Sequence, residues 1–194
     1  VKFDPNSQTT VRGSNGNASN WLPAGGSFLV LPINEKISVG VASVGYFGSA
    51  LNYGHHWVGR YYLTRTACQG FSFVPGAAYK WNDCLSFGAS INVMYAIDRS
   101  HAMINNSLDN QKDGRLRAIG NHWAVGAIVG VLYEPNECTR FGISYVTEVK
   151  QKFHMKPKFL NIGPRLTQAL TVTGILNSKI KVDCNVPNWV MASV

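Results

Sequence analysis

The residue types that most often bind metals are few in this sequence, and their spacing forms no metal-binding pattern. The adjacent pair His55 and His56 would point to opposite faces of an extended segment, which is poor geometry for ligating one ion. Neither a His-Glu-x-x-His nor a His-x-His pattern occurs among the five histidines, which are His55, His56, His101, His122 and His154. The sequence therefore predicts no metal site.

The four cysteines also lack the spacing of a metal site or a redox pair. They are Cys68, Cys84, Cys138 and Cys184, and no Cys-x-x-Cys occurs among them. Cys84 and Cys138 fall in two predicted turns at the same end of a sheet. Two intervening strands would hold them about 14 Å apart, which is too far for a disulfide. We therefore expect no bridge between them.

Motifs of covalent and cofactor chemistry are missing as well. The sequence has no Gly-x-Ser-x-Gly elbow, no P-loop, no dinucleotide-binding fingerprint and no pair of carboxylates spaced for acid–base work. We therefore expect that the protein is not an enzyme and that it binds no cofactor.

The chain is basic but carries little charge for its length. Its 194 residues include 18 Lys and Arg against 10 Asp and Glu, a net charge of +8. Charged residues make up 14% of the chain, against about 25% in typical soluble domains. Basic residues gather loosely at 112–117 and 150–158, without the interleaved aromatic residues of a nucleic-acid module. We expect lipopolysaccharide or an anionic substrate as partner, and no nucleic acid.

Apolar content excludes two broad classes of protein. Apolar residues reach 45% and aromatic residues 11%, which a disordered chain would not contain. The longest stretch without a charge, residues 37–59, holds five glycines and two histidines, so it is no apolar helical span of about 18 residues. The low charge and the aromatic content together indicate a surface that does not face water alone.

The elements that would position any site are strands. In residues 85–97, nearly every second residue is large and apolar, and those between are small or polar. Residues 123–133 and 141–149 alternate in the same way. A period of two residues predicts strands with two chemically different faces.

Two further features favour the wall of a membrane barrel over a soluble sandwich. Trp123 and Tyr133 lie ten residues apart on one face, about 33 Å along a strand or about 25 Å of height at the usual tilt. This height matches the apolar band between the aromatic girdles of outer-membrane barrels. The face opposite the apolar one is rich in Gly, Ser and Ala, which suits a barrel interior.

The lengths of the connections between the predicted strands also favour a barrel. Short polar turns are expected at 32–36, 80–84 and 134–138, and long segments at 46–60, 100–120 and 156–178. Short turns at one end and long loops at the other are typical of transmembrane barrels. Six or seven strands are expected, at 26–31, 37–45, 61–80, 85–99, 121–133 and 140–154, with a start near 180–190.

The strand count implies an incomplete structure. Bacterial single-chain barrels close with an even number of strands, at least eight, and an open sheet edge is not tolerated in lipid. We therefore expect residues 1–194 to form one partial barrel domain that does not fold alone. Residues 1–5 have neither the basic nor the apolar region of a signal peptide, so a leader has been removed or the chain is a piece of a longer one.

Several stretches, taken in order, resemble one family. Residues 53–61 read YGHHWVGRY and residues 75–88 read PGAAYKWNDCLSFG. Residues 120–126 read GNHWAVG, followed by GVLYEP at 130–135 and RFGISYVTEV at 140–149. In this order they are similar to the long-chain fatty acid transporters of the Gram-negative outer membrane, the FadL/TodX family. The resemblance covers about residues 32–187.

This resemblance implies a fourteen-stranded barrel with an N-terminal hatch and C-terminal strands that are absent from this sequence. It implies uptake of long-chain fatty acids or other hydrophobic molecules by passive, binding-driven diffusion. The family's ligand leaves sideways through an opening made by an inward kink in the third strand. The matching positions here are Gly45, Tyr46 and Gly48, where glycine accepts strained backbone and interrupts pairing.

The resemblance also suggests where a fatty acid would be held. Its carboxylate needs a cation or a hydrogen-bond donor. Lys150, together with Lys152, has the parity of the inward face, and a salt-bridge ladder inside the barrel is the alternative explanation for both. Arg99 closes the strand predicted at 85–99 at its loop end, but it has the parity of the lipid face.

Two groups of residues at the loop end have both a functional and a structural explanation. Trp57 and Arg60 could line the entrance, or serve as a girdle tryptophan with an arginine reaching lipid phosphates. An apolar capture surface on the long loops would consist of Phe47, Leu51, Met103, Ile104, Phe159, Leu160 and Ile162. Packing between loops would account for the same residues.

The expected function is therefore transport through the outer membrane by a protein that is monomeric at full length. A structural or adhesive outer-membrane barrel with a closed interior is the alternative, and a soluble β-sandwich binding domain is the third possibility. The individual ligand is not determined by family resemblance.

Overall fold

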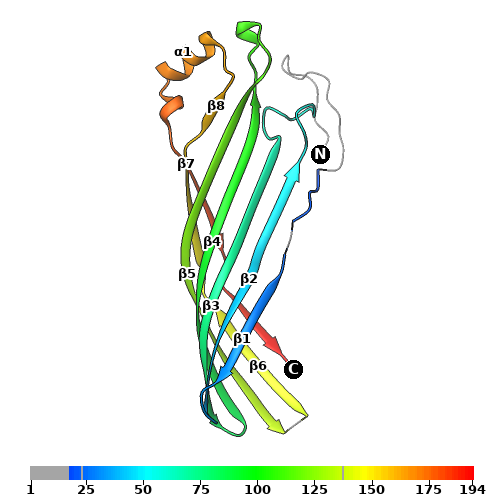
Figure 1. Cartoon of the computed structure of the whole chain (residues 1–194), viewed down its shortest axis with the longest axis vertical. Helices are drawn as coiled ribbons and strands as arrows, with labels where there is room; N and C mark the ends of the chain where they lie inside the picture. Colours follow the sequence, from blue (N-terminus) through cyan, green and yellow to red (C-terminus); the bar gives the residue numbers. More distant parts are fainter. Residues whose placement is uncertain (1–17, 23, 137) are drawn as a thin grey trace.

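The computed structural model describes residues 18–22, 24–136 and 138–194. Residues 1–5, for which no signal peptide is expected, lie outside this part. One residue of the turn expected at 134–138 also lies outside it. Most of the described chain is antiparallel sheet, as predicted, with short turns at one end and the loops and helix α1 at the other (Figure 1). We call these ends the turn end and the loop end.

The large sheet has the order β1-β2-β3-β4-β5-β6-β10, with β8 also paired to β5. Its strands are β1 (Gly26–Pro32), β2 (Ile37–Asn52), β3 (Arg65–Asn82), β4 (Leu85–Ile104), β5 (Gly114–Asn136), β6 (Thr139–Val146), β8 (Lys158–Leu160) and β10 (Trp189–Ser193). A second sheet pairs β7 (Val149–Met155) with β9 (Ile180–Val186). The helices are α1 (Pro164–Val172), η1 (Ser107–Asp109) and η2 (Ile175–Asn177).

The two faces of the large sheet differ as the alternation predicts. On β4 the even-numbered residues Met94 and Ala96 are completely buried, whereas Ile91 is 54% exposed. On β5, Trp123 and Val125 are 64% and 65% exposed. We call the face with Met94 the inner face and the other the outer face. The outer face presents large apolar side chains to its surroundings, as a lipid-facing wall does.

Several strands are longer than predicted. Strand β2 continues to Asn52 rather than ending at 45, β4 continues to Ile104, and β5 begins at Gly114. Backbone pairing continues where the side chains stop alternating, because the ladder needs only the main-chain groups. The long segments expected at 46–60 and 100–120 are therefore strand at 46–52, at 100–104 and at 114–120. Among the described residues, no helix is long and apolar enough to span a membrane.

One predicted strand, 140–154, is broken into β6 and β7. At the break the Thr147 N–H donates to the Ala127 carbonyl (3.0 Å), but the Ala127 N–H donates to Thr147 Oγ1 (2.8 Å) instead of a backbone carbonyl. On the partner strand, Pro187 separates β9 from β10 and has no N–H to donate. Both strands of this pair therefore bend at the same level.

Beyond the bend, β7 and β9 leave the edge of β5 and pack over the inner face (Figure 1). Phe153 and Met155 contact Ala96 and Ala118, and Val149 contacts Met94 and Ala124 in the same way. In the part of the chain that the structure describes, the β5 edge between its pairings with β6 and β8 has no strand neighbour.

Glycines on β5 make this close approach possible. A Cβ on Gly120 would lie 2.8 Å from Met155 Cγ, and a Cβ on Gly126 would lie 2.8 Å from Val149 Cγ2. A Cβ at either position would force the contacting side chain of β7 to shift.

Candidate functional site

The inner face forms an apolar trough near the turn end. Its volume is about 700 Å³, within the range of about 300–1,000 Å³ that is usual for small-molecule sites. One row of the register explains the hollow, since it places small residues side by side across five strands. These residues are Ser38, Ala78, Gly88, Gly130 and Ser144.

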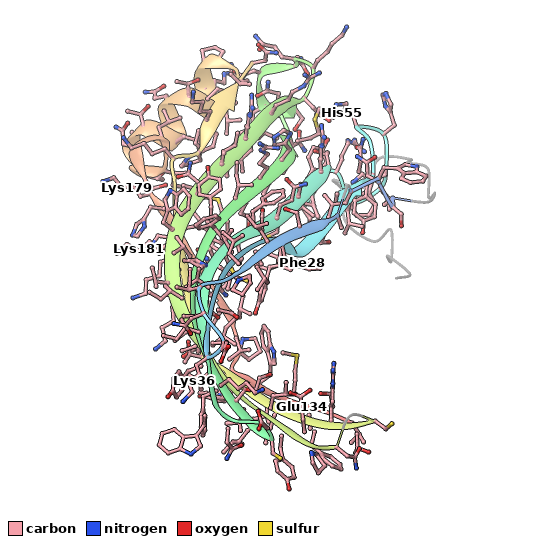
Figure 2. All side chains as sticks on the ribbon, turned by 60° about the horizontal axis from the view of Figure 1, so that its bottom comes forward. Phe28, Lys36, His55, Glu134, Lys179 and Lys181 are labelled. Carbon is pink, nitrogen blue, oxygen red and sulfur yellow. The ribbon has the colours of Figure 1, made fainter. Side chains whose placement is uncertain are left out.

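The sheet curves around one side, and the trough lies open on its inner face (Figure 2). Lys36 and Glu134 mark the turn end in this view, and His55 lies at the loop end. Phe28 on β1 and Met191 on β10 line the trough from strands near opposite ends of the sheet order. An extended hydrocarbon is the ligand chemistry that such a lining suits best.

An aromatic pair limits the trough on the side of the loop end. The rings of Tyr46 on β2 and Trp189 on β10 have centroids 5.4 Å apart. Trp189 pairs with Val146, which in turn pairs with the trough residue Ile128. Because β2 and β10 lie near opposite edges of the sheet order, this contact bridges the inner face.

A β-bulge brings Tyr46 into this position. The register of β2 against β3 shifts between Gly45 and Phe47, so Tyr46 is the extra residue. Tyr46 and Phe47 both pack against the buried cluster around Met94. Phe47 and Leu51 therefore belong to β2, and the prediction that places them on a long loop is wrong.

The predicted kink positions are contacted by the segment before β1. The Gly45 N–H donates to the Gly25 carbonyl (2.9 Å), and a Cβ on Gly48 would overlap the Leu22 side chain. Farther along, the Asn20 N–H donates to the Ala50 carbonyl (3.2 Å). Whether this irregular stretch acts as a lateral opening stays a prediction.

Arg60 is part of a buried network at the loop end. Its Nε lies 3.2 Å from Asp113 Oδ2, and its Nη2 donates to the Tyr61 hydroxyl at 3.1 Å. The Tyr61 hydroxyl donates to the same carboxylate at 3.0 Å. Burial alone would lower the Arg60 pKa, but the hydrogen bonds to Asp113 and Tyr61 outweigh it and raise that pKa. Arg60 thus holds two loop segments together.

Trp57 has a similar structural setting. Its ring stacks on Tyr53 with centroids 4.4 Å apart, and its Nε1–H donates to the Leu63 carbonyl. Gly59 lies against the same ring, where a Cβ would collide with it. Beside this loop lies a polar cleft of about 550 Å³ lined by His55, His56, Arg60, Met103, Gln111, Lys112, Asp113 and Arg115.

Lys150 and Lys152 do not face the inner side of the sheet, so the inward orientation expected for them is wrong. On β7 the buried residues are Val149, Gln151, Phe153 and Met155, whereas both lysines are exposed. The bend after Val146 shifts the alternation by one residue, so the odd positions face inward. The Lys150 Nζ lies 3.5 Å from Glu148 Oε2.

Arg99 is exposed on β4, in register with Ile119 of β5. Its odd position places it on the outer face, as its parity predicts. The trough lining includes neither Arg99 nor Lys150 nor Trp57.

Among the buried polar side chains that sequence reasoning missed, three have atoms without a hydrogen-bond partner in the described part of the chain. Asn92 and Gln151 are completely buried, and Ser72 is 2% exposed. Within the described residues, no hydrogen-bond partner reaches Ser72 Oγ, either polar atom of the Asn92 side chain, or Gln151 Nε2. The available signal was Asn92 itself, an amide in the middle of a strand whose inward neighbours are small or apolar.

Comparison with known proteins shows what this architecture is related to. A sequence model of the family described as "Outer membrane protein transport protein (OMPP1/FadL/TodX)" matches residues 2–192. The long-chain fatty acid transport protein of Escherichia coli O6:H1 is 26% identical over 204 residues, covering 90% of this chain and 45% of that protein. This chain therefore spans less than half the length of that relative.

Solved structures share the fold. A FadL homologue of Pseudomonas aeruginosa superposes with a TM-score of 0.70 at 17% identity, over 85% of this chain and 43% of that one. The toluene transporter TbuX of Ralstonia pickettii has a TM-score of 0.56 at 14% identity, over 86% of this chain and 49% of that one. The predicted barrel fold is thereby confirmed. The family match extends over nearly the whole sequence and agrees with these structures, so the chain belongs to the outer membrane transport protein family OMPP1/FadL/TodX.

Proposed function

We propose that the protein containing this chain carries long-chain fatty acids or other hydrophobic molecules across the outer membrane by binding-driven passive diffusion. The observation that supports this most is the apolar trough on the inner face, about 700 Å³ in volume and floored by small residues. It offers a hydrocarbon chain a surface that is shielded from the lipid-facing side. Nothing in this function requires covalent chemistry.

Uptake of labelled oleate tests the proposal. Cells that lack their own transporter would express the complete protein that carries this sequence, and its folding would be checked by heat-modifiable migration in SDS gels. We expect uptake above that of cells with an empty vector. A folded protein in the outer membrane that takes up no oleate would contradict the fatty acid proposal.

The route out of the barrel is a finer proposal. Lateral exit would occur at Gly45, Tyr46 and Gly48, where β2 bulges and Leu22 lies against the strand. Bulky residues at Gly45 and Gly48 should then reduce oleate uptake while the protein still folds. Unchanged uptake by such a folded variant would exclude this exit.

The basic residues that the sequence offered for the carboxylate remain candidates for capture outside the trough. Lys150 and Arg99 are both exposed, and Lys150 is loosely paired with Glu148. If they attract the anion, the double variant Lys150→Ala/Arg99→Ala should weaken oleate binding severalfold. Unchanged affinity would remove both from the site.

The other candidate residues would act nearer the loop end. Phe47 and Leu51 would contact the hydrocarbon, and Trp57 and Arg60 would keep the entrance loop in shape. We propose in addition that the complete protein is monomeric and that its basic loop end contacts lipopolysaccharide.

A second candidate function is a structural or adhesive barrel with a closed interior. The Tyr46–Trp189 contact across the inner face favours it, because this pair narrows the interior above the trough. The uptake experiment distinguishes the two, since a closed barrel takes up no ligand.

A further inference from the structure

Basic side chains gather on the outer face of the sheet near the loop end. Four of them are directly opposite one another in the register across β3, β4, β5 and β8. Residues directly opposite in a sheet lie about 5 Å apart on the same face. We call this set the basic row, and it consists of Arg65, His101, Arg117 and Lys158. Arg99 lies two residues before His101, so it extends the row on the same face toward the turn end.

In the described part of the chain, the basic row has no acidic partners. Arg65, Arg117 and Lys158 are exposed, and so is Arg99. None of the ion pairs between described residues includes any of these side chains. Like charges that lie directly opposite in a sheet repel each other and destabilise it. An anion that binds along the row would therefore stabilise this part of the sheet.

Basic residues at the turn end have a different setting. Lys80 Nζ lies 2.9 Å from Asp83 Oδ1, and Arg140 Nε lies 2.8 Å from Glu134 Oε1. These cations are paired with carboxylates of the same chain, whereas the cations of the basic row are left to an external partner. The difference fits a membrane that presents anionic groups on the side of the loop end.

The height of the basic row above the apolar wall indicates the partner. Phe71, Tyr95 and Trp123 are opposite one another on the outer face, and the Tyr95 and Trp123 rings have centroids 4.8 Å apart. Aromatic residues so placed are typical of the girdle at the membrane surface. On β4, Arg99 and His101 lie four and six residues beyond Tyr95, about 10 and 15 Å of height at the usual tilt. The row therefore lies just outside the apolar band, where long basic side chains can reach the polar part of a lipid.

We propose that the basic row binds the phosphate groups of lipopolysaccharide at the outer wall of the barrel. Short turns face the periplasm in outer-membrane barrels, so the loop end lies in the leaflet that carries this lipid. The guanidinium groups of Arg65 and Arg117 donate to phosphate oxygens in the bidentate geometry that suits arginine, and Lys158 adds a further charge. This inference rests on the proposed contact of the loop end with lipopolysaccharide and names the residues that make it.

Lipid binding to the complete protein, purified in detergent and freed of lipid, tests the proposal. The row variant Arg65→Gln/Arg117→Gln removes the two arginines of the row and leaves Arg99 in place, because Arg99 is also a candidate for fatty acid capture. The matched control variant Lys80→Gln/Arg140→Gln removes the same charge at the turn end. The three probes are lipopolysaccharide, the same lipid after enzymatic removal of its phosphates, and phosphatidylglycerol.

The wild-type protein should bind intact lipopolysaccharide most tightly of the three probes. The row variant should bind it about 10-fold more weakly, whereas the control variant should bind it as the wild type does. Without lipid, the row variant should fold and be at least as stable as the wild type in heat-modifiable gel migration, because like charges have been removed. Added lipopolysaccharide should raise the midpoint of the gel shift more for the wild type than for the row variant.

Three results would overturn the proposal. The first is unchanged binding of lipopolysaccharide by the row variant. The second is an equal loss in the control variant, which would show an effect of net charge alone. The third is equal wild-type affinity for the dephosphorylated lipid or for phosphatidylglycerol, which would exclude recognition of the phosphates of lipopolysaccharide.

Two outcomes separate this inference from the proposed function. A wild-type protein that binds no lipopolysaccharide would contradict the proposed contact of the loop end as well as this inference. Oleate uptake tests the transport proposal by itself, since both variants should retain the uptake of the wild type. A protein that binds lipopolysaccharide through the basic row but takes up no oleate would contradict the transport proposal alone.

Discussion

Arg60, which the sequence offers for an entrance or for lipid phosphates, forms with Asp113 a contact that supports the structure of a loop. The Arg60 side chain is 9% exposed, and Asp113, at 25%, accepts hydrogen bonds from both Arg60 and Tyr61. The Arg60 carbonyl also accepts the Met103 N–H at 2.8 Å, which ties this loop to the end of β4. The loop that carries the Trp57–Arg60 motif is thus held in place against the end of β4.

Asp113→Ala should loosen this loop. It leaves the nearly buried guanidinium of Arg60 without its carboxylate, which should cost about 1–3 kcal/mol of folding free energy. We expect faster limited proteolysis in residues 53–64 and a lower midpoint of heat-induced gel shift. The control is Asp83→Ala, which removes the ion pair between Asp83 and Lys80. Because the Asp83 side chain is 98% exposed, this variant should have little effect on either readout. Equal behaviour of the two variants would contradict this role of Arg60.

At the scale of the element, the bent strand pair β6–β7 and β9–β10 decides what the inner face can hold. The bend follows from Thr147, whose hydroxyl replaces a backbone acceptor, and from Pro187, which has no N–H. Beyond it, the glycines of β5 let β7 lie directly on the sheet. The trough is confined to the part of the inner face that β7 and β9 leave uncovered.

Gly126→Val should therefore destabilise the protein. The new side chain would begin 2.8 Å from Val149 Cγ2 and 3.0 Å from Thr147 Oγ1, and such overpacking costs about 1–3 kcal/mol. Denaturant unfolding in detergent measures the loss. Gly88→Val is the matched control on the same inner face, because only the Ala77 carbonyl, at 3.9 Å, lies near a Cβ there. A Gly126→Val protein as stable as this control would show that β7 does not pack as described.

How well the sequence predicts a feature depends on whether that feature is set by the local pattern of residues or by contacts in three dimensions. The facing of the side chains depends on alternation, which the sequence displays directly, and it agrees with the structure for β4, β5 and β6. The orientation of Lys150 depends on a bend set by one hydroxyl and one proline, and alternation carries no trace of either. The partnerless Asn92 depends on what surrounds it in three dimensions, so the sequence could show only that an amide was out of place.

At the scale of the whole molecule, the chain is a curved wall with three levels on its inner side. The trough lies near the turn end, the Tyr46–Trp189 pair closes it, and the β7–β9 pair covers the face beyond. The large apolar side chains of the outer face fit the outer membrane location of the family. The central proposal is that a hydrophobic molecule passing through this interior occupies the trough.

The most direct test fills the trough and measures transport. Gly88→Leu, in the middle of the row of small residues, would be compared with wild type for labelled oleate uptake in cells lacking their own transporter. Ala127→Leu, on the exposed outer face of β5, adds similar bulk outside the trough. We expect Gly88→Leu to fold and to lose most of its uptake, and Ala127→Leu to retain it. Full uptake by a folded Gly88→Leu protein would contradict the account.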